Sequence, residues 1–181
     1  MVLVWEGDGS EAFGDGVGVQ EDLERLARAE DDLAACLEEH GASSEAAIDK
    51  VQATVRLCNS VALRLSGQGF GSLAEETLSK AMTLTEAGML LPGSLPLRRA
   101  LRVETLSNVS CAYMQAGRPR AARRALARAV RLERTGAAAS GRGWAPALAN
   151  MCAVLSRLGK HTKAVRLARK AVELLEGAGG C

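Results

Sequence analysis

The chain has 181 residues, a formal net charge of +2, and a composition that is 48% hydrophobic but only 3% aromatic. This length suits one substantial domain or a short array of repeats. Most of the hydrophobic residues are Ala, Leu and Val, no stretch alternates in the manner of a strand series, and Ala and Leu favour helices, so we predict an all-α fold. No apolar run reaches the ~20 residues of a membrane span, and we expect no membrane partner.

Acidic and basic residues are unevenly divided along the chain. Residues 1–50 contain 14 acidic and 3 basic residues, whereas residues 51–181 contain 20 basic and 7 acidic ones. This division into an acidic N-terminal part and a basic remainder favours contact with other charged surfaces, including those of a second copy of the chain. The five cysteines are far apart in the sequence and form no CxxC pair, so we expect reduced, mostly buried thiols, a cytoplasmic location, and no metal or other cofactor.

The chain divides into four parts. Residues 1–19 are acidic and rich in Gly, which predicts a flexible arm. Residues 20–41 predict a single capping helix that starts with acidic residues and ends at Gly41. The pattern in residues 44–177 predicts three helix pairs, at about 44–88, 97–134 and 144–177. Residues 178–181 form a tail after the last pair.

The clearest helix pair lies at Val103 to Glu133. An apolar face recurs at helical spacing up to Tyr113, Gly117 then ends the first helix, and Pro119 suits the first turn of the second. The connection is so short that the two helices must pack antiparallel.

The same marks recur in all three pairs. A turn glycine is followed by an alanine five residues later and by a second alanine seven residues after that. These residues are Gly69, Ala74 and Ala81; Gly117, Ala122 and Ala129; and Gly159, Ala164 and Ala171. Three agreeing sets predict an internal repeat with spacings of 48 and 42 residues.

The central unit resembles a tetratricopeptide repeat (TPR). The match is carried by Leu106, Ser110, Tyr113, Gly117, Ala122, Leu126 and Ala129. The long spacing is similar to that of kinesin-light-chain repeats, in which a unit reads LxNLAxxYxxxGxxxxA, and Leu148, Asn150, Gly159 and Ala164 fit the same pattern. Two departures are Arg134 in place of a final Pro and Leu155 in place of the aromatic residue. The resemblance covers roughly residues 51–176. It implies a right-handed α-solenoid of about three helix pairs with an N-terminal capping helix, and it is compatible with a cytoskeletal or ciliary association.

The resemblance also implies a concave peptide-binding groove lined by the first helix of each unit. The implied groove residues are Ser107, Asn108, Cys111, Met114, Gln115, Asn150 and Arg157. The amide groups of Asn108 and Asn150 can both donate to and accept from a peptide backbone. The alternative is that each asparagine only ties its own helix to a neighbour. Because no catalytic constellation accompanies these residues, we expect a non-catalytic scaffold that binds a peptide or helix of a partner protein, and not an enzyme.

Arginines provide a second candidate surface within residues 118–134. Arg120, Arg124, Arg128 and Arg131 follow one another at steps of four, four and three, which places them on one helix face. This face is either a solvated exterior or a site for a polyanion such as RNA or an acidic protein tail. Nucleic acid is the less favoured partner because aromatic residues for base stacking are missing nearby. The acidic helix from Glu21 to Glu39 is a simpler partner, within one chain or head to tail between copies.

Overall fold

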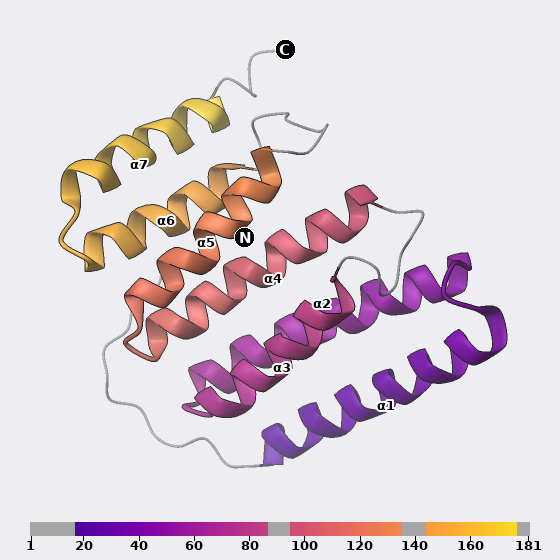
Figure 1. The fold of residues 1–181 in the computed structure, drawn as a ribbon. Coiled ribbons are helices and arrows are strands. Elements are labelled where there is room, and N and C mark those ends of the chain that lie inside the picture. Colours follow the sequence, from indigo (N-terminus) through magenta and orange to yellow (C-terminus); the bar gives the residue numbers. More distant parts are fainter. Residues whose placement is uncertain (1–16, 87–94, 135–143, 177–181) are drawn as a thin grey trace.

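Seven α-helices and no strand are found in the residues that the computed structural model describes, which are 17–86, 95–134 and 144–176 (Figure 1). This confirms the predicted all-α class. The helices are α1 (Val17–His40), α2 (Glu45–Gly67), α3 (Gly71–Leu84), α4 (Leu95–Gln115), α5 (Pro119–Arg134), α6 (Trp144–Arg157) and α7 (His161–Glu176).

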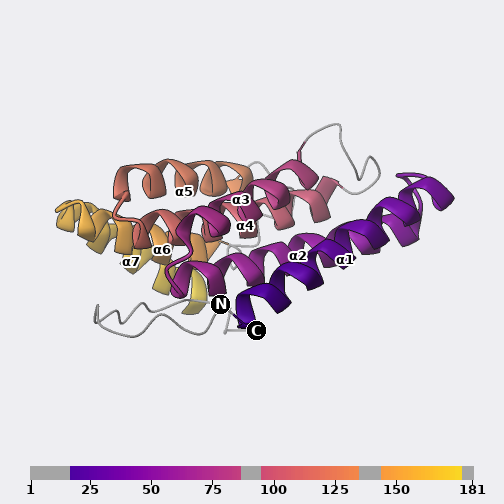
Figure 2. The same cartoon turned by 90° about the horizontal axis from the view of Figure 1, so that it is seen from below.

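The helices pack mainly against their neighbours in sequence. Short turns join α2 to α3, α4 to α5 and α6 to α7, and each of these pairs packs side by side. The pairs follow one another across the molecule, from indigo α1 at one end to yellow α7 at the other (Figure 1). Helix α4 packs against both α2 and α3, whereas α6 packs on α5 and touches α4 only sparsely. Seen from below, α3 and α5 lie on the same side of α4 (Figure 2).

The turn glycines explain where the first helix of each pair ends. Gly117 has a φ of 67°, in the left-handed region that only glycine adopts without strain. The amide of Arg118 then donates to the carbonyl of Tyr113 at 2.7 Å, which satisfies one of the last free carbonyls of α4. Gly69 and Gly159 have the same conformation and are followed by the same type of hydrogen bond.

The repeated alanines lie where paired helices approach each other. All six are buried, with exposed fractions of 5% or less: Ala74, Ala81, Ala122, Ala129, Ala164 and Ala171. A methyl group lets two backbones come close, and larger side chains such as Leu106 and Leu126 fill the space beside it. The sequence register therefore marks the packing faces correctly.

Helix α1 covers α2 at one end of the row. Leu26 and Leu33 are buried in one cluster with Val51 and Val55 of α2. The helix begins at Val17, three residues before the expected boundary, because Val19 is itself buried against the core. The predicted limit of the arm at residue 19 is therefore wrong, and the rest of the arm and the tail at 178–181 lie outside the described residues.

The start of α4 also differs from the expectation. The helix begins at Leu95, two residues before the predicted unit boundary, and it includes Pro96 in its first turn. A proline is tolerated there because the amide that it lacks would have no partner within the helix.

Candidate binding surfaces on the α4–α5 pair

The predicted groove residues of α4 form a partly exposed polar stripe. We define the polar stripe as Ser107, Asn108 and Cys111, all three of which are half-buried. The two other groove residues of α4 serve helix packing. Met114 packs into the cluster shared with α6, and the carbonyl oxygen of the Gln115 side chain accepts a hydrogen bond from the Ser66 hydroxyl of α2.

Asn108 and Asn150 are half-buried, and neither side chain makes a hydrogen bond within the described part of the chain. Their amide groups thus do not tie α4 or α6 to a neighbour, as the alternative interpretation required. Asn59 of α2 does act in that way, because its fully enclosed amide donates to the Thr105 hydroxyl of α4 at 3.2 Å. The amides of Asn108 and Asn150 therefore remain available to a ligand.

The predicted groove residues of the third unit lie on α6. Asn150 and the exposed Arg157 lie on α6, which is supported by α5 and touches α4 only sparsely. Arg157 also interacts with another residue of the chain. No hydrogen bond joins the side chains of Asn108 and Asn150 in the described part of the chain.

A cleft of about 450 Å³ opens between α3 and α5, on the far side of α4 from the polar stripe. At the helical repeat of 3.6 residues, the α4 residues that line the cleft lie roughly 160° around the helix from the stripe. The accessible apolar lining comes from the half-buried Met82, Val109, Tyr113 and Ala121. The polar lining consists of Glu75, Ser79, Arg118, Arg124 and Arg128. We call this feature the arginine cleft.

The predicted basic face of α5 is partly incorporated into this cleft. Arg124 and Arg128 line it, whereas Arg120 at the start of α5 and Arg131 near its end are exposed and are not in its lining. Arg131 interacts with another residue of the chain. Within the described residues, neither Arg124 nor Arg128 has an acidic partner or a hydrogen bond from its side chain.

One end of the arginine cleft is electrically balanced. The Arg118 guanidinium lies 2.6 Å from a carboxylate oxygen of Glu75 and 4.4 Å from the centre of the Tyr113 ring. This ion pair and cation–π contact connect the turn before α5 to α3 and α4. A ligand at this end would meet a neutralised arginine.

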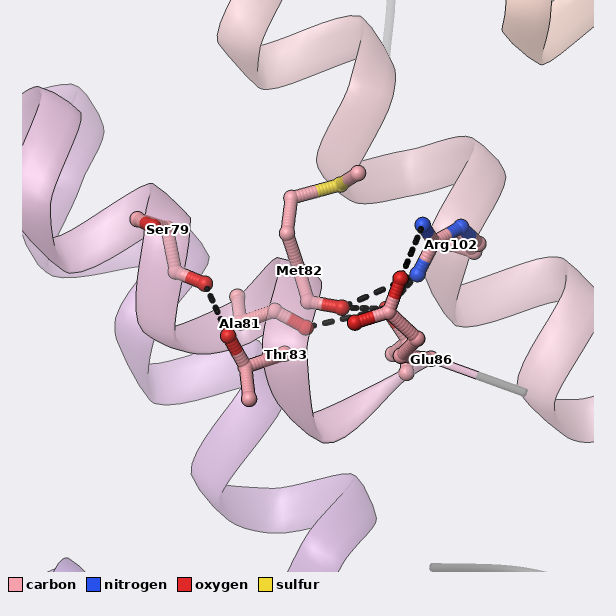
Figure 3. A network of polar contacts seen from close by, with 7 residues as sticks. Ser79, Ala81, Met82, Thr83, Glu86 and Arg102 are labelled. Atoms are coloured by element: carbon pink, nitrogen blue, oxygen red, sulfur yellow. Dashed lines mark hydrogen bonds and ion pairs between the residues drawn. The ribbon is translucent and has the colours of Figure 1, made fainter. Parts of the chain in front are cut away.

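The other end carries unbalanced positive charge. Arg102 of α4 donates to the carbonyl of Met82 at 2.9 Å, and its guanidinium lies 4.0 Å from the Glu86 carboxylate (Figure 3). Burial lowers the pKa of Arg102, and repulsion from Arg128 and Arg98 lowers that pKa further. Arg128 thus belongs to a group of like charges that the single Glu86 carboxylate offsets only in part.

The acidic residues of α1 do not face these arginines. Asp22 makes a paired contact with Arg64 of α2, Asp32 pairs with Lys50 at 3.1 Å, and Glu30 pairs with Lys80 at 2.8 Å. For these three carboxylates, the expected pairing with the arginines of α5 within one chain is wrong. They instead fasten α1 to α2 and α3.

Among the described cysteines, Cys58 is buried in the core, whereas Cys36, Cys111 and Cys152 are half-buried. Burial raises the pKa of the Cys58 thiol to about 11, and burial also raises the pKa of Cys111 in the polar stripe. Neither thiol is activated as a nucleophile. The described residues contain no group of three or more His, Cys, Asp or Glu side chains able to hold a metal ion, and none of their helices is long and apolar enough to cross a membrane.

Sequence reasoning missed Glu75 of the cleft, because this residue belongs to a wall whose position depends on the distance between α3 and α5. Comparison with protein-family models finds no match, and comparison with curated protein sequences finds none either.

Proposed function

We propose that this chain is a non-catalytic protein-interaction module built as a TPR-type solenoid, with α1 as its cap. Three antiparallel helix pairs, their common glycine turns and their buried alanines support this architecture. In such a stack α2, α4 and α6 are the first helices of the units, and their exposed faces form the binding side.

The observation that carries the proposal is the half-buried amide of Asn108 on α4, which makes no hydrogen bond within the described residues, repeated by Asn150 on α6. An amide that no helix uses can pair with the backbone of an extended peptide, and the neighbouring side chains can select its sequence. The module then acts by holding a segment of another protein, in a cytoplasmic setting.

A quantitative pull-down with mass spectrometry tests this function. Proteins captured by the wild type are compared with those captured by Asn108→Ala/Asn150→Ala and by Arg120→Glu/Arg124→Glu/Arg128→Glu. The proposal expects the asparagine variant to lose the main partner and the arginine variant to retain it. The opposite pattern, or a partner that survives both changes, contradicts it.

A second candidate function is anion binding by the arginines of α5. The observation that favours it is the pair Arg124 and Arg128, which face one cleft and lack acidic partners in the described residues. Negative charge alone does not distinguish the possible ligands, because acidic protein segments, RNA and a second copy of the chain all carry it. The shape of the cleft must therefore select among them.

A further inference from the structure

We propose that the arginine cleft binds a short acidic segment of a partner protein, with an apolar side chain against Met82 and Val109 and a carboxylate between Arg124 and Arg128. This inference rests on the second candidate function and is independent of the polar stripe, because the two surfaces lie on different sides of α4.

The size of the cleft limits the ligand. A volume of about 450 Å³ is within the range of pockets that enclose a small ligand or a few side chains. The cleft runs along α3 and α5, which both start at the same end of it. Arg118 and Glu75 meet at this end, and Met82 and Arg128 lie farther along the two helices. A narrow groove between two such helices fits one peptide segment.

The charges fix the orientation of that segment. At the Met82 end, a ligand carboxylate beside Arg128 would offset the repulsion between Arg128 and Arg102, which together with burial lowers the Arg102 pKa. At the other end, Glu75 repels a second carboxylate. The acidic group of the peptide therefore lies beside Arg124 and Arg128, and its apolar group lies over the middle of the cleft.

The apolar lining of the arginine cleft favours a peptide over a ligand that carries only negative charge. Met82, Val109 and Ala121 are half-exposed, and covering them with an apolar side chain is favourable at about 25 cal/mol per Å². A phosphate backbone has nothing to place there and would contact Arg120 and Arg131 on the open face of α5 equally well. The cleft geometry thus favours an acidic peptide over RNA.

The test is a selection of phage-displayed random 12-residue peptides on the whole chain, followed by fluorescence anisotropy with labelled winners. We expect the selected peptides to combine Asp or Glu with a large apolar residue. Their affinity should fall at least tenfold for Arg124→Glu/Arg128→Glu. It should fall severalfold for Met82→Ala, and it should weaken with added salt. The matched control is Arg166→Glu/Arg169→Glu on α7, where both arginines are also exposed, and this variant should bind like the wild type.

The selected peptides must also bind the Asn108→Ala/Asn150→Ala variant. This control distinguishes failure of the proposed peptide groove from failure of the proposed cleft site. Selected peptides without acidic residues, or equal binding by the Arg124→Glu/Arg128→Glu variant, would overturn the proposal. Equal affinity for poly-Glu or single-stranded RNA would assign the arginines to a general polyanion face. Tightest binding by a synthetic peptide of residues 1–16 would replace the partner with the chain itself. Thermal unfolding of each variant, followed by circular dichroism, shows that the fold is kept.

Discussion

Replacing Ala129 with Leu tests the packing register of the repeat. Ala129 of α5 has an exposed fraction of 0% and belongs to the cluster of Val103, Leu106 and Ala125. A leucine there adds three carbon atoms where α4 and α5 approach closely, and overpacking of this kind costs about 1–3 kcal/mol. For a domain of this size each kcal/mol lowers the Tm by about 2–4 °C.

Ala127, on the exposed face of the same helix, provides the control. Leu and Ala differ little in helix propensity, so Ala127→Leu should change the free energy of unfolding by no more than about 0.5 kcal/mol. Urea unfolding followed by circular dichroism at 222 nm measures both variants. Equal stability of the two leucine variants would refute the argument that the recurrent alanines mark close helix contacts.

Three further predictions concern α1, the turns and the core thiol. Asp22→Asn removes the negative charge and one of the two acceptor oxygens that the Arg64 guanidinium uses, and it should cost about 1–2 kcal/mol. Asp32→Asn, in an exposed pair, should cost less than about 0.5 kcal/mol in the same urea assay. Gly117→Ala should cost about 1–2 kcal/mol of the free energy of unfolding because the φ of Gly117 is 67°, even though an added methyl group would meet nothing within 4 Å. Gly67→Ala, in the last turn of α2, should instead stabilise the protein. The Cys58 thiol ionises near pH 9.0 when unfolded but only near pH 11 when folded. Stability is therefore full below pH 9.0 and falls as the pH rises from 9.0 to about 11, and a Cys58→Ala variant should show a smaller decline over this range.

The sequence predicted the fold through features that act locally. Gly117 marks a turn and Ala122 marks a close contact between helices, and both features depend on only a few neighbouring residues. Their spacing could therefore be counted along the chain. The start of α1 was missed because Val19 becomes helical through contact with a distant core cluster. The start of α4 lies two residues before the predicted boundary at 97, because the first turn of a helix accepts Pro96.

The candidate sites were predicted less completely because they depend on distances between helices. The resemblance to a repeat family implied Asn108 as a candidate groove residue, and the spacing of the arginines predicted that Arg124 and Arg128 share one helix face. It could not show that α3 stands far enough from α5 to leave a cleft, or that Arg102 adds its charge to that of Arg128. Nor could it show that α6 rests on α5 and hardly touches α4.

We propose that the polar stripe and Asn150 hold a peptide. An NMR titration tests this binding by following the side-chain amide signals of Asn108 and Asn150 as the partner segment that the wild type captures is added. We expect both pairs of amide protons to shift in proportion to the bound fraction, and we expect the segment to lose affinity for the Asn108→Ala/Asn150→Ala variant. Saturating binding that leaves both amide signals unmoved would contradict it.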